Sequence, residues 1–161
     1  MFSKTPSKIQ SRYALKKTIS QLRKKSGKKI RVVFTNGCFD LLHRGHVSYL
    51  EKARLLGDIL VVALNTDISV KAIKGDGRPI NTLKDRMVVM AALQAVDYVT
   101  WFNETTPLSL INFLKPDILV KGGDWKTRQI VGAKEVLSWG GRVRSLKYLT
   151  GFSTTNLLSG R

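Results

Sequence analysis

The stretch IRVVFTNGCFDLLHRGH, residues 30–46, decides the fold of this 161-residue chain. It begins with an apolar, β-branched run over residues 30–35, which predicts a buried strand. It ends where residues 45–56 take up a helical spacing of apolar side chains. Gly37, between the two, allows a tight turn and a close approach of a ligand to the backbone. The stretch therefore predicts a strand, a loop and a helix that together form one unit of an α/β domain.

Both histidines of the chain, His43 and His46, lie at the predicted start of this helix. Unpaired backbone N–H groups and the helix dipole favour an anion there, and two imidazoles three residues apart share one face of the helix. The pair therefore indicates a phosphate site; the alternative is two surface or capping histidines. In the loop before them, Asp40 is suited to hydrogen-bond the loop itself or a sugar, and Cys38 is suited to fill a small apolar space.

The rest of the chain alternates between strand and helix patterns. A continuous apolar run predicts a strand at residues 58–65, and further strand candidates are residues 98–102, 117–121 and 142–146. Helical patterns at about 83–95, 107–114 and 129–139 separate them. This alternation predicts an α/β fold with a doubly wound parallel sheet, whose ligand lies beyond the carboxyl ends of the strands at a topological switch point. No GxGxxG motif follows the first strand, which argues against an NAD-binding oxidoreductase.

The composition predicts a cytoplasmic globular protein. The apolar content is 43%, yet no apolar run is long enough to span a bilayer. The N-terminus lacks the apolar segment of a secretory signal. Because Cys38 is the only cysteine, an intramolecular disulfide and a cysteine-cluster metal site are both excluded.

The formal charge of +17 is concentrated near the N-terminus. Residues 1–30 contain ten of the 28 Lys and Arg and none of the 11 acidic residues, which leaves +7 for the remainder. The milder charge of the remainder suits small polyanionic substrates. A basic segment also has an alternative use, which is to bind nucleic acid or an anionic surface.

We therefore divide the chain into a basic extension, residues 1–28, and a main domain, residues 29–161. Leu15, Ile19 and Leu22 have helical spacing, so the extension is expected to be partly helical and to pack on the domain edge. Its deletion is expected to leave the chemistry of the domain largely intact.

Residues 71–81, KAIKGDGRPIN, are polar, basic and rich in glycine. They predict a mobile substrate loop that closes Lys71 and Lys74 over phosphate groups. The alternative is a solvated connection with ordinary surface lysines. Just beyond it, Arg86 is placed either to fork onto phosphate or to pair with Asp85 or Asp97.

Residues 120–125, VKGGDW, lie at the end of a predicted strand and so share the end of the sheet that carries the histidines. Lys121 is suited to meet an anionic group, and Asp124 is suited to bind hydroxyls, a base or metal-bound water. Trp125 either stacks on a ligand or packs against the protein.

Two separated motifs resemble those of the cytidylyltransferase-like nucleotidyltransferases. GCFDLLHRGH, residues 37–46, resembles the first motif, whose HxGH element holds the phosphates of a nucleoside triphosphate. GFSTTN, residues 151–156, resembles the GxSTT element near the family's C-terminus. The likeness runs from about residue 28 to the C-terminus, and it is similar in detail to the D-glycero-β-D-manno-heptose 1-phosphate adenylyltransferase family at residues 35–46, 75–81, 85–87, 116–125 and 151–156.

This resemblance implies an enzyme that transfers AMP from ATP to heptose 1-phosphate, giving ADP-heptose and pyrophosphate by direct in-line attack. The product would feed lipopolysaccharide or a related surface glycan. The resemblance further implies a separate sugar kinase, Mg²⁺ held mainly by substrate phosphates, and a homo-oligomer as a plausible assembly. Residues 148–150 are Tyr-Leu-Thr, where glycerol-phosphate cytidylyltransferases carry an arginine, which counts against CTP. The alternative acceptors are glycerol 3-phosphate, FMN and phosphopantetheine.

The resemblance also implies a role for each matching residue. No metal-ligating side chain is assigned. The residues expected to act in catalysis are His43, His46, Lys74 and Arg86. Those expected to bind the nucleotide are Thr35, Asn36, Gly37, Cys38, Phe39, Asp40, Gly45, Gly122, Asp124, Ser153, Thr154 and Thr155. Those expected to bind the acceptor are Lys71, Arg78, Lys121 and Trp125.

Overall fold

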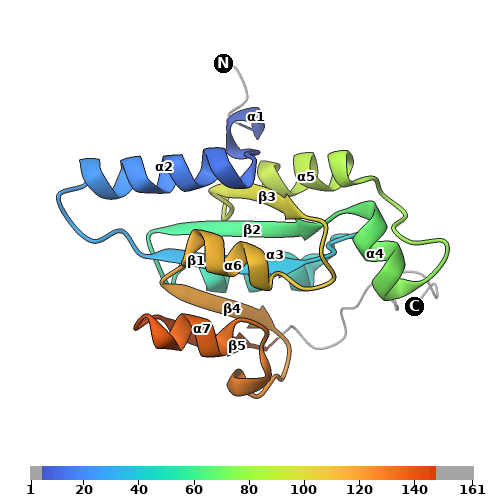
Figure 1. The fold of residues 1–161 in the computed structure, drawn as a ribbon. Helices are drawn as coiled ribbons and strands as arrows, with labels where there is room; N and C mark the ends of the chain where they lie inside the picture. Colours follow the sequence, from blue (N-terminus) through green and yellow to red (C-terminus); the bar gives the residue numbers. More distant parts are fainter. Residues whose placement is uncertain (1–4, 148–161) are drawn as a thin grey trace.

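The computed structural model describes residues 5–147, which form a parallel sheet with helices on both faces (Figure 1). The five strands lie in the order β3-β2-β1-β4-β5, and every neighbouring pair is parallel. The strands are β1 (Val32–Gly37), β2 (Ile59–Asn65), β3 (Tyr98–Phe102), β4 (Ile118–Gly122) and β5 (Arg142–Leu146). The doubly wound parallel sheet predicted from the sequence is therefore confirmed.

The helices alternate with the strands along the chain. They are α1 (Thr5–Lys8), α2 (Arg12–Lys25), α3 (Arg44–Arg54), α4 (Asp67–Lys74), α5 (Leu83–Ala92), α6 (Leu108–Leu114) and α7 (Ala133–Ser138), with a 3₁₀ turn, η1 (Thr127–Gln129), before α7. The helix predicted over residues 129–139 is thus shorter and interrupted. Gly132 has a φ of 87°, which is not helical, so the chain turns there before α7 begins. A Cβ at this position would also lie 2.7 Å from Ile111 Cδ1, so glycine fits there best.

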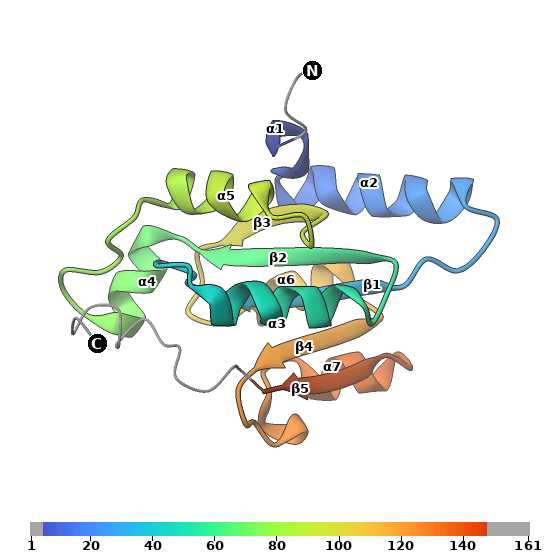
Figure 2. The same ribbon diagram turned by 180° about the vertical axis from the view of Figure 1, so that it is seen from behind.

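Two cores cover the two faces of the sheet. Apolar side chains of α2, α6 and α7 pack on one face, seen toward the viewer in Figure 1. Those of α3 and α5 pack on the other face, which Figure 2 turns to the front. Because both faces are buried, β2 is an almost uninterrupted apolar run, as expected of a strand in a parallel sheet.

The N-terminal helices take part in this packing. Leu15 is fully buried and Ile19 is 2% exposed, and both belong to the core on the α6 and α7 face. Ahead of α2, Ile9 forms a parallel bridge with Val99, and the Gln10 amide donates to the Val99 carbonyl at 2.9 Å. The N-terminal segment thus pairs with edge strand β3 and covers part of an otherwise open sheet edge.

Helix α4 was not predicted, and it changes the interpretation of residues 71–81. Thr66 caps the helix by accepting a hydrogen bond from the Ser69 amide, and Asp67 favours its first turn. Lys71 and Lys74 therefore lie on a helix, and the glycine-rich loop begins only at Gly75. No helix in residues 5–147 has the length and apolar character needed to cross a membrane.

Candidate active site

A cavity of about 410 Å³ opens beyond the carboxyl ends of β1 and β4. These strands are neighbours, but the chain leaves β1 for β2 on one side and returns to β4 on the other, so the cavity lies at the topological switch point. Sequence-predicted site residues among its lining are Asn36, Gly37, Cys38, Phe39, Asp40, His46, Lys74, Lys121 and Trp125. The structure therefore brings residues from three separate predicted segments, 30–46, 71–81 and 120–125, to one site.

The loop after β1 approaches this cavity with a constrained backbone. Phe39 has a φ of 44°, which is uncommon for a bulky residue and costs on the order of 1–3 kcal/mol, so the surrounding contacts must offset this cost. Its ring packs edge-on against the His46 imidazole, with 5.2 Å between centroids. A Cβ on Gly37 would lie 2.9 Å from Phe39 Cε2, so only glycine leaves room for the ring in this position.

The two histidines form a stacked pair at the start of α3. His43 is the N-cap residue, in extended backbone conformation, and its side chain makes no capping hydrogen bond. The His43 and His46 rings stack with centroids 3.8 Å apart and an interplanar angle of 27°. The shared helix face predicted from their spacing is therefore observed, and the pair stands beside the positive end of the helix dipole.

Burial keeps these imidazoles neutral near pH 7. Desolvation lowers the pKa of His43. Desolvation, with added repulsion from His43 and Lys74, lowers the pKa of His46 to about 4. Each ring then carries a single N–H donor in the ligand-free protein. A bound polyanion would attract positive charge on the imidazoles, raise their pKa and so favour the imidazolium form.

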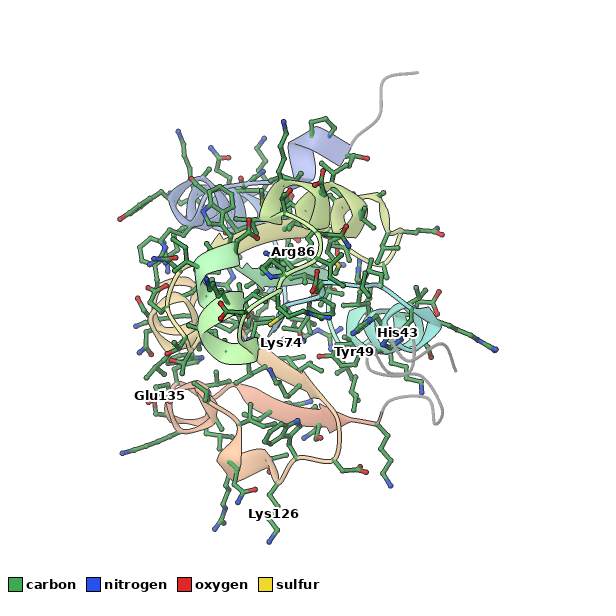
Figure 3. The ribbon with its side chains drawn as sticks, turned by 90° about the vertical axis from the view of Figure 1, so that its right-hand side faces the viewer. His43, Tyr49, Lys74, Arg86, Lys126 and Glu135 are labelled. Atoms are coloured by element: carbon green, nitrogen blue, oxygen red, sulfur yellow. The ribbon has the colours of Figure 1, made fainter. Side chains whose placement is uncertain are left out.

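Two lysines add positive charge on other sides of the cavity. Lys74 lies at the end of α4, and Lys121 lies near the end of β4 with Nζ 3.5 Å from the Asn36 carbonyl. Burial lowers the pKa of Lys121 from its ordinary value. Figure 3 looks onto the strand ends and shows Lys74 on the face of the molecule that also carries His43. Together these cations and imidazoles make the cavity suited to an anionic ligand.

Asp40 and Arg78 organise the loop rather than face the cavity as free charges. The Asp40 side chain is fully buried; it accepts from the Ile80 amide at 2.9 Å and from the Asn81 amide at 2.9 Å. Arg78 Nε lies 2.9 Å from its Oδ2 atom. Of the two uses predicted for Asp40, binding the loop or a sugar, the structure shows the first.

Arg86 does not line the cavity. Its side chain is 1% exposed, and its three nitrogens donate to the Asn81 carbonyl, the Cys38 carbonyl and Asp67. The expected pairing with Asp85 or Asp97 is wrong. This geometry corrects the interpretation of Arg86 as a phosphate ligand, because internal acceptors already occupy its guanidinium.

Several other expected site residues lie outside the cavity lining, and His43 is one of them, although its ring stacks on His46, which lines the cavity. Thr35 is buried, with Oγ1 2.5 Å from the Tyr49 hydroxyl. Lys71 pairs with Asp76 at 3.0 Å, and Asp124 lies 4.0 Å from Lys147. Gly45 and Gly122 are buried at the start of α3 and the end of β4. Ser153, Thr154 and Thr155 lie outside the described residues.

Trp125 stands at the rim of the cavity and is half exposed. Its indole N–H donates to the Gly122 carbonyl at 3.0 Å, and its backbone amide donates to Ser145 Oγ at 3.1 Å. These bonds fix the side chain while leaving much of its surface open. Trp125 is therefore placed to contact a ligand as well as to pack.

Sequence reasoning missed one wall of the cavity. This wall comes from the ends of β2 and α4, the loop before α6 and the segment before α7, and consists of Asn65, Ile73, Thr105, Thr106, Pro107, Gln129, Ile130 and Val131. Most of these residues follow strands β2, β3 and β4, so the rule that ligands bind at carboxyl strand ends was the available signal. Among residues 5–147 no cluster of three or more His, Cys, Asp or Glu is arranged to hold a metal ion.

The histidine environment predicts a ligand-dependent titration. In the free protein the His46 imidazole should stay neutral until the pH falls to about 4, and an ATP analogue should raise this pKa. NMR titration of the imidazole resonances measures both values, and the His43→Gln variant assists their assignment. Because unfolding restores the ordinary pKa of 6.5, His46 should also reduce the stability of the free protein as the pH falls from 6.5 toward 4. A His46 pKa near 6.5, unmoved by the analogue, would contradict this description.

Comparison with known proteins adds an independent finding. Residues 34–158 match the family described as cytidylyltransferase-like. The chain is 53% identical over 138 residues to the bifunctional protein HldE of Marinomonas sp. (strain MWYL1), and 51% identical over 150 residues to that of Photorhabdus laumondii subsp. laumondii. These matches cover 86% and 93% of this chain but only 29% and 31% of the relatives, so the chain spans less than a third of their length.

Solved structures share the fold. The lipopolysaccharide core biosynthesis protein from Thermoplasma volcanium GSS1 superposes with a TM-score of 0.59 at 27% identity, covering 75% of this chain and 98% of that one. The pantoate-beta-alanine ligase from Francisella tularensis has a TM-score of 0.57 at 16% identity, covering 94% and 76%. The second likeness is one of fold alone.

Proposed function

The chain belongs to the cytidylyltransferase-like family of nucleotidyltransferases, and on this basis we propose that it transfers AMP from ATP to D-glycero-β-D-manno-heptose 1-phosphate. The products are ADP-heptose and pyrophosphate. The choice of heptose is supported by the motif resemblance and by identity of 51% or more to proteins named HldE. The 27% identical neighbour, which is described as a lipopolysaccharide core biosynthesis protein, supports the same choice.

One observation carries the nucleotidyl-transfer part of this proposal. His46 lines a single cavity at the switch point together with Lys74 and Lys121, and His43 stacks on the His46 ring at the start of α3. The carboxylate that lines this cavity, Asp40, is already occupied by loop amides and Arg78. The cavity thus offers donors and positive charge to a triphosphate with little opposing negative charge.

The reaction depends on stabilising negative charge on the substrates and the leaving group more than on proton transfer. An oxygen of the sugar phosphate attacks the α-phosphorus of ATP, the new O–P bond forms, and the bond from that phosphorus to the bridging oxygen of pyrophosphate breaks. The attacking phosphate is anionic near neutral pH, so no catalytic base is required. Positioning two polyanions and stabilising charge on the leaving pyrophosphate are then the main contributions of the protein.

We assign the side chains accordingly. His46 and His43 donate to the triphosphate and to the pentavalent centre, while Lys74 and Lys121 neutralise charge on the leaving group and the acceptor phosphate. The hydroxyls of Ser153, Thr154 and Thr155 are proposed to bind β and γ oxygens. Mg²⁺, held mainly by the phosphates and water, would supply further neutralisation of the triphosphate. A sugar kinase must supply the phosphorylated acceptor, so the proposal includes such a partner.

A substrate panel tests this function. Pyrophosphate release is measured with ATP or CTP against heptose 1-phosphate, glycerol 3-phosphate, FMN and phosphopantetheine, and the nucleotide product is identified by mass spectrometry. ADP-heptose from ATP and heptose 1-phosphate is the expected product. Turnover with a different acceptor alone would replace the heptose assignment while keeping nucleotidyl transfer. Absence of turnover and of nucleotide binding across the whole panel would overturn the enzyme assignment.

A further inference from the structure

Asn65 places a buried amide group in the cavity wall that sequence reasoning missed. It is the last residue of β2, it is 3% exposed, and it lines the cavity. Its Nδ2 atom donates to Ser69 Oγ at 2.8 Å, and Ser69 Oγ donates in turn to the Glu104 carbonyl at 2.8 Å. This chain of hydrogen bonds joins the end of β2 to α4 and to the segment that follows β3.

The bonds of Ser69 determine which way the Asn65 amide group points. A hydroxyl group has one proton to donate, and the Ser69 proton is used on the Glu104 carbonyl, which itself has no proton. Ser69 Oγ can then only accept from Asn65, which requires the amide NH₂ group on that side. The Asn65 oxygen therefore faces the other way, with Oδ1 4.0 Å from Cys38 Sγ. Cys38 lines the cavity and Ser69 does not, so the oxygen is the amide atom on the cavity side.

This oxygen is a hydrogen-bond acceptor, unlike the cationic groups of the cavity. Among residues 5–147 its only donor is the Cys38 thiol, which is a weak donor, and an amide oxygen has two lone pairs. Lys74 and Lys121 offer N–H groups to phosphate oxygens, which when ionised can only accept. Asn65 Oδ1 is therefore unsuited to a phosphate oxygen and suited to a ligand group that carries a proton, such as a hydroxyl.

The place of Asn65 in the sheet indicates which substrate carries this hydroxyl. In the strand order, β2 and β4 lie on opposite sides of β1. The proposed reaction places the triphosphate at the ends of β1 and β4, beside His46, so a side chain at the end of β2 faces the side on which the acceptor must enter. A sugar phosphate brings several hydroxyl groups to that side.

We infer that Asn65 is a specificity-determining residue that accepts a hydrogen bond from a hydroxyl group of the acceptor sugar phosphate. Ser69 is the positioning residue that keeps the amide oxygen toward the cavity. The inference rests on the proposed function, because it adds a contact with the acceptor of the same reaction. It gives the cavity a means to distinguish a sugar phosphate from a phosphate ester that lacks a hydroxyl at this place.

The first test uses the wild-type protein with acceptor analogues, so it does not depend on the folding of a variant. Heptose 1-phosphates in which one hydroxyl at a time is replaced by hydrogen are assayed with ATP for pyrophosphate release. We expect one analogue to lower kcat/KM roughly tenfold or more, because the buried acceptor atom is then left without its partner. If no analogue lowers kcat/KM by more than about twofold, which is less than one neutral hydrogen bond contributes, the inference is overturned.

The second test identifies the protein partner of that hydroxyl. In Asn65→Ala the native acceptor and the sensitive analogue should have nearly equal kcat/KM values, because the atom that distinguishes them is gone. Ser69→Ala should reduce the difference in part, since the amide is no longer held in one orientation, and it decides the question if Asn65→Ala does not fold. Asn103→Ala, at an exposed asparagine just after β3 and outside the cavity lining, is the matched control and should keep the wild-type difference. A wild-type difference in folded Asn65→Ala or Ser69→Ala would overturn the inference.

Analogues of the nucleotide separate the acceptor from the ribose as the source of the hydroxyl. If Asn65→Ala abolished discrimination against 2′-deoxy-ATP or 3′-deoxy-ATP but against no acceptor analogue, the hydroxyl would belong to the ribose and the inference would be wrong. A wild-type protein that does not turn over ATP with heptose 1-phosphate would instead overturn the proposed function.

Discussion

Replacing His46 with alanine is expected to lower kcat for pyrophosphate release by about a hundredfold or more, equivalent to roughly 3 kcal/mol of transition-state stabilisation. His46 lines the cavity, stacks on His43 and lies close enough to Lys74 for their charges to interact. In the proposed mechanism its N–H group donates to the phosphates, where negative charge develops. Steady-state kinetics with ATP and heptose 1-phosphate measure the effect.

The matched variant is His46→Asn, which keeps a side-chain N–H donor but loses the imidazole ring. It should recover part of the activity that alanine loses, because the neutral imidazole acts through a single donor. Circular dichroism must show that both variants are folded, since Phe39 packs against the His46 ring. Near-normal turnover in a folded His46→Ala protein would remove the central role assigned to this residue.

Replacing Leu15 with alanine is expected to lower the free energy of unfolding by about 2–5 kcal/mol, the usual range for a fully buried leucine. Leu15 has no exposed surface and packs in the core between α2 and the sheet. Chemical denaturation followed by circular dichroism measures the change. For the same reason, removing residues 1–28 should destabilise the domain, even if the chemistry of the site is unchanged in the molecules that remain folded.

Lys17→Ala is the matched control on the same helix, because Lys17 is exposed. Its effect on unfolding should stay within about 0.5 kcal/mol, as is usual for surface positions. If Leu15→Ala were as mild as Lys17→Ala, the N-terminal helix would not contribute to the core as described. If Lys17→Ala kept full stability but lost nucleotidyl transfer, the basic side chains of α2 would instead have a functional role.

The order of elements and the histidine pair were predictable because both depend on local sequence. A buried parallel strand is an apolar run, and β2 and β4 lie where such runs occur. The spacing of His43 and His46 placed both rings on one helix face, and the structure shows them stacked. Helix α4 was not predicted, because the glycine-rich loop after it made the whole segment look like a loop. The available signal was Thr66, the capping residue just before the helix.

The partners of Arg86 and Asp40 could not be predicted, because they depend on contacts between residues distant in the chain. Arg86 reaches Cys38, 48 positions away, and Asp40 reaches Ile80 and Asn81 across a similar separation. Sequence patterns identify a charged side chain near a site but not whether it faces the ligand or the protein. For Arg86 and Asp40 the sequence left both uses open, and the structure shows each side chain buried and bonded to the protein.

The most direct test is a crystal structure of the protein with α,β-methylene ATP and heptose 1-phosphate bound together. We expect the triphosphate to enter the cavity at the ends of β1 and β4 and to contact His46, with an acceptor oxygen aligned on the α-phosphorus opposite the methylene bridge. A nucleotide bound at another surface, with both imidazoles unoccupied by phosphate, would contradict it.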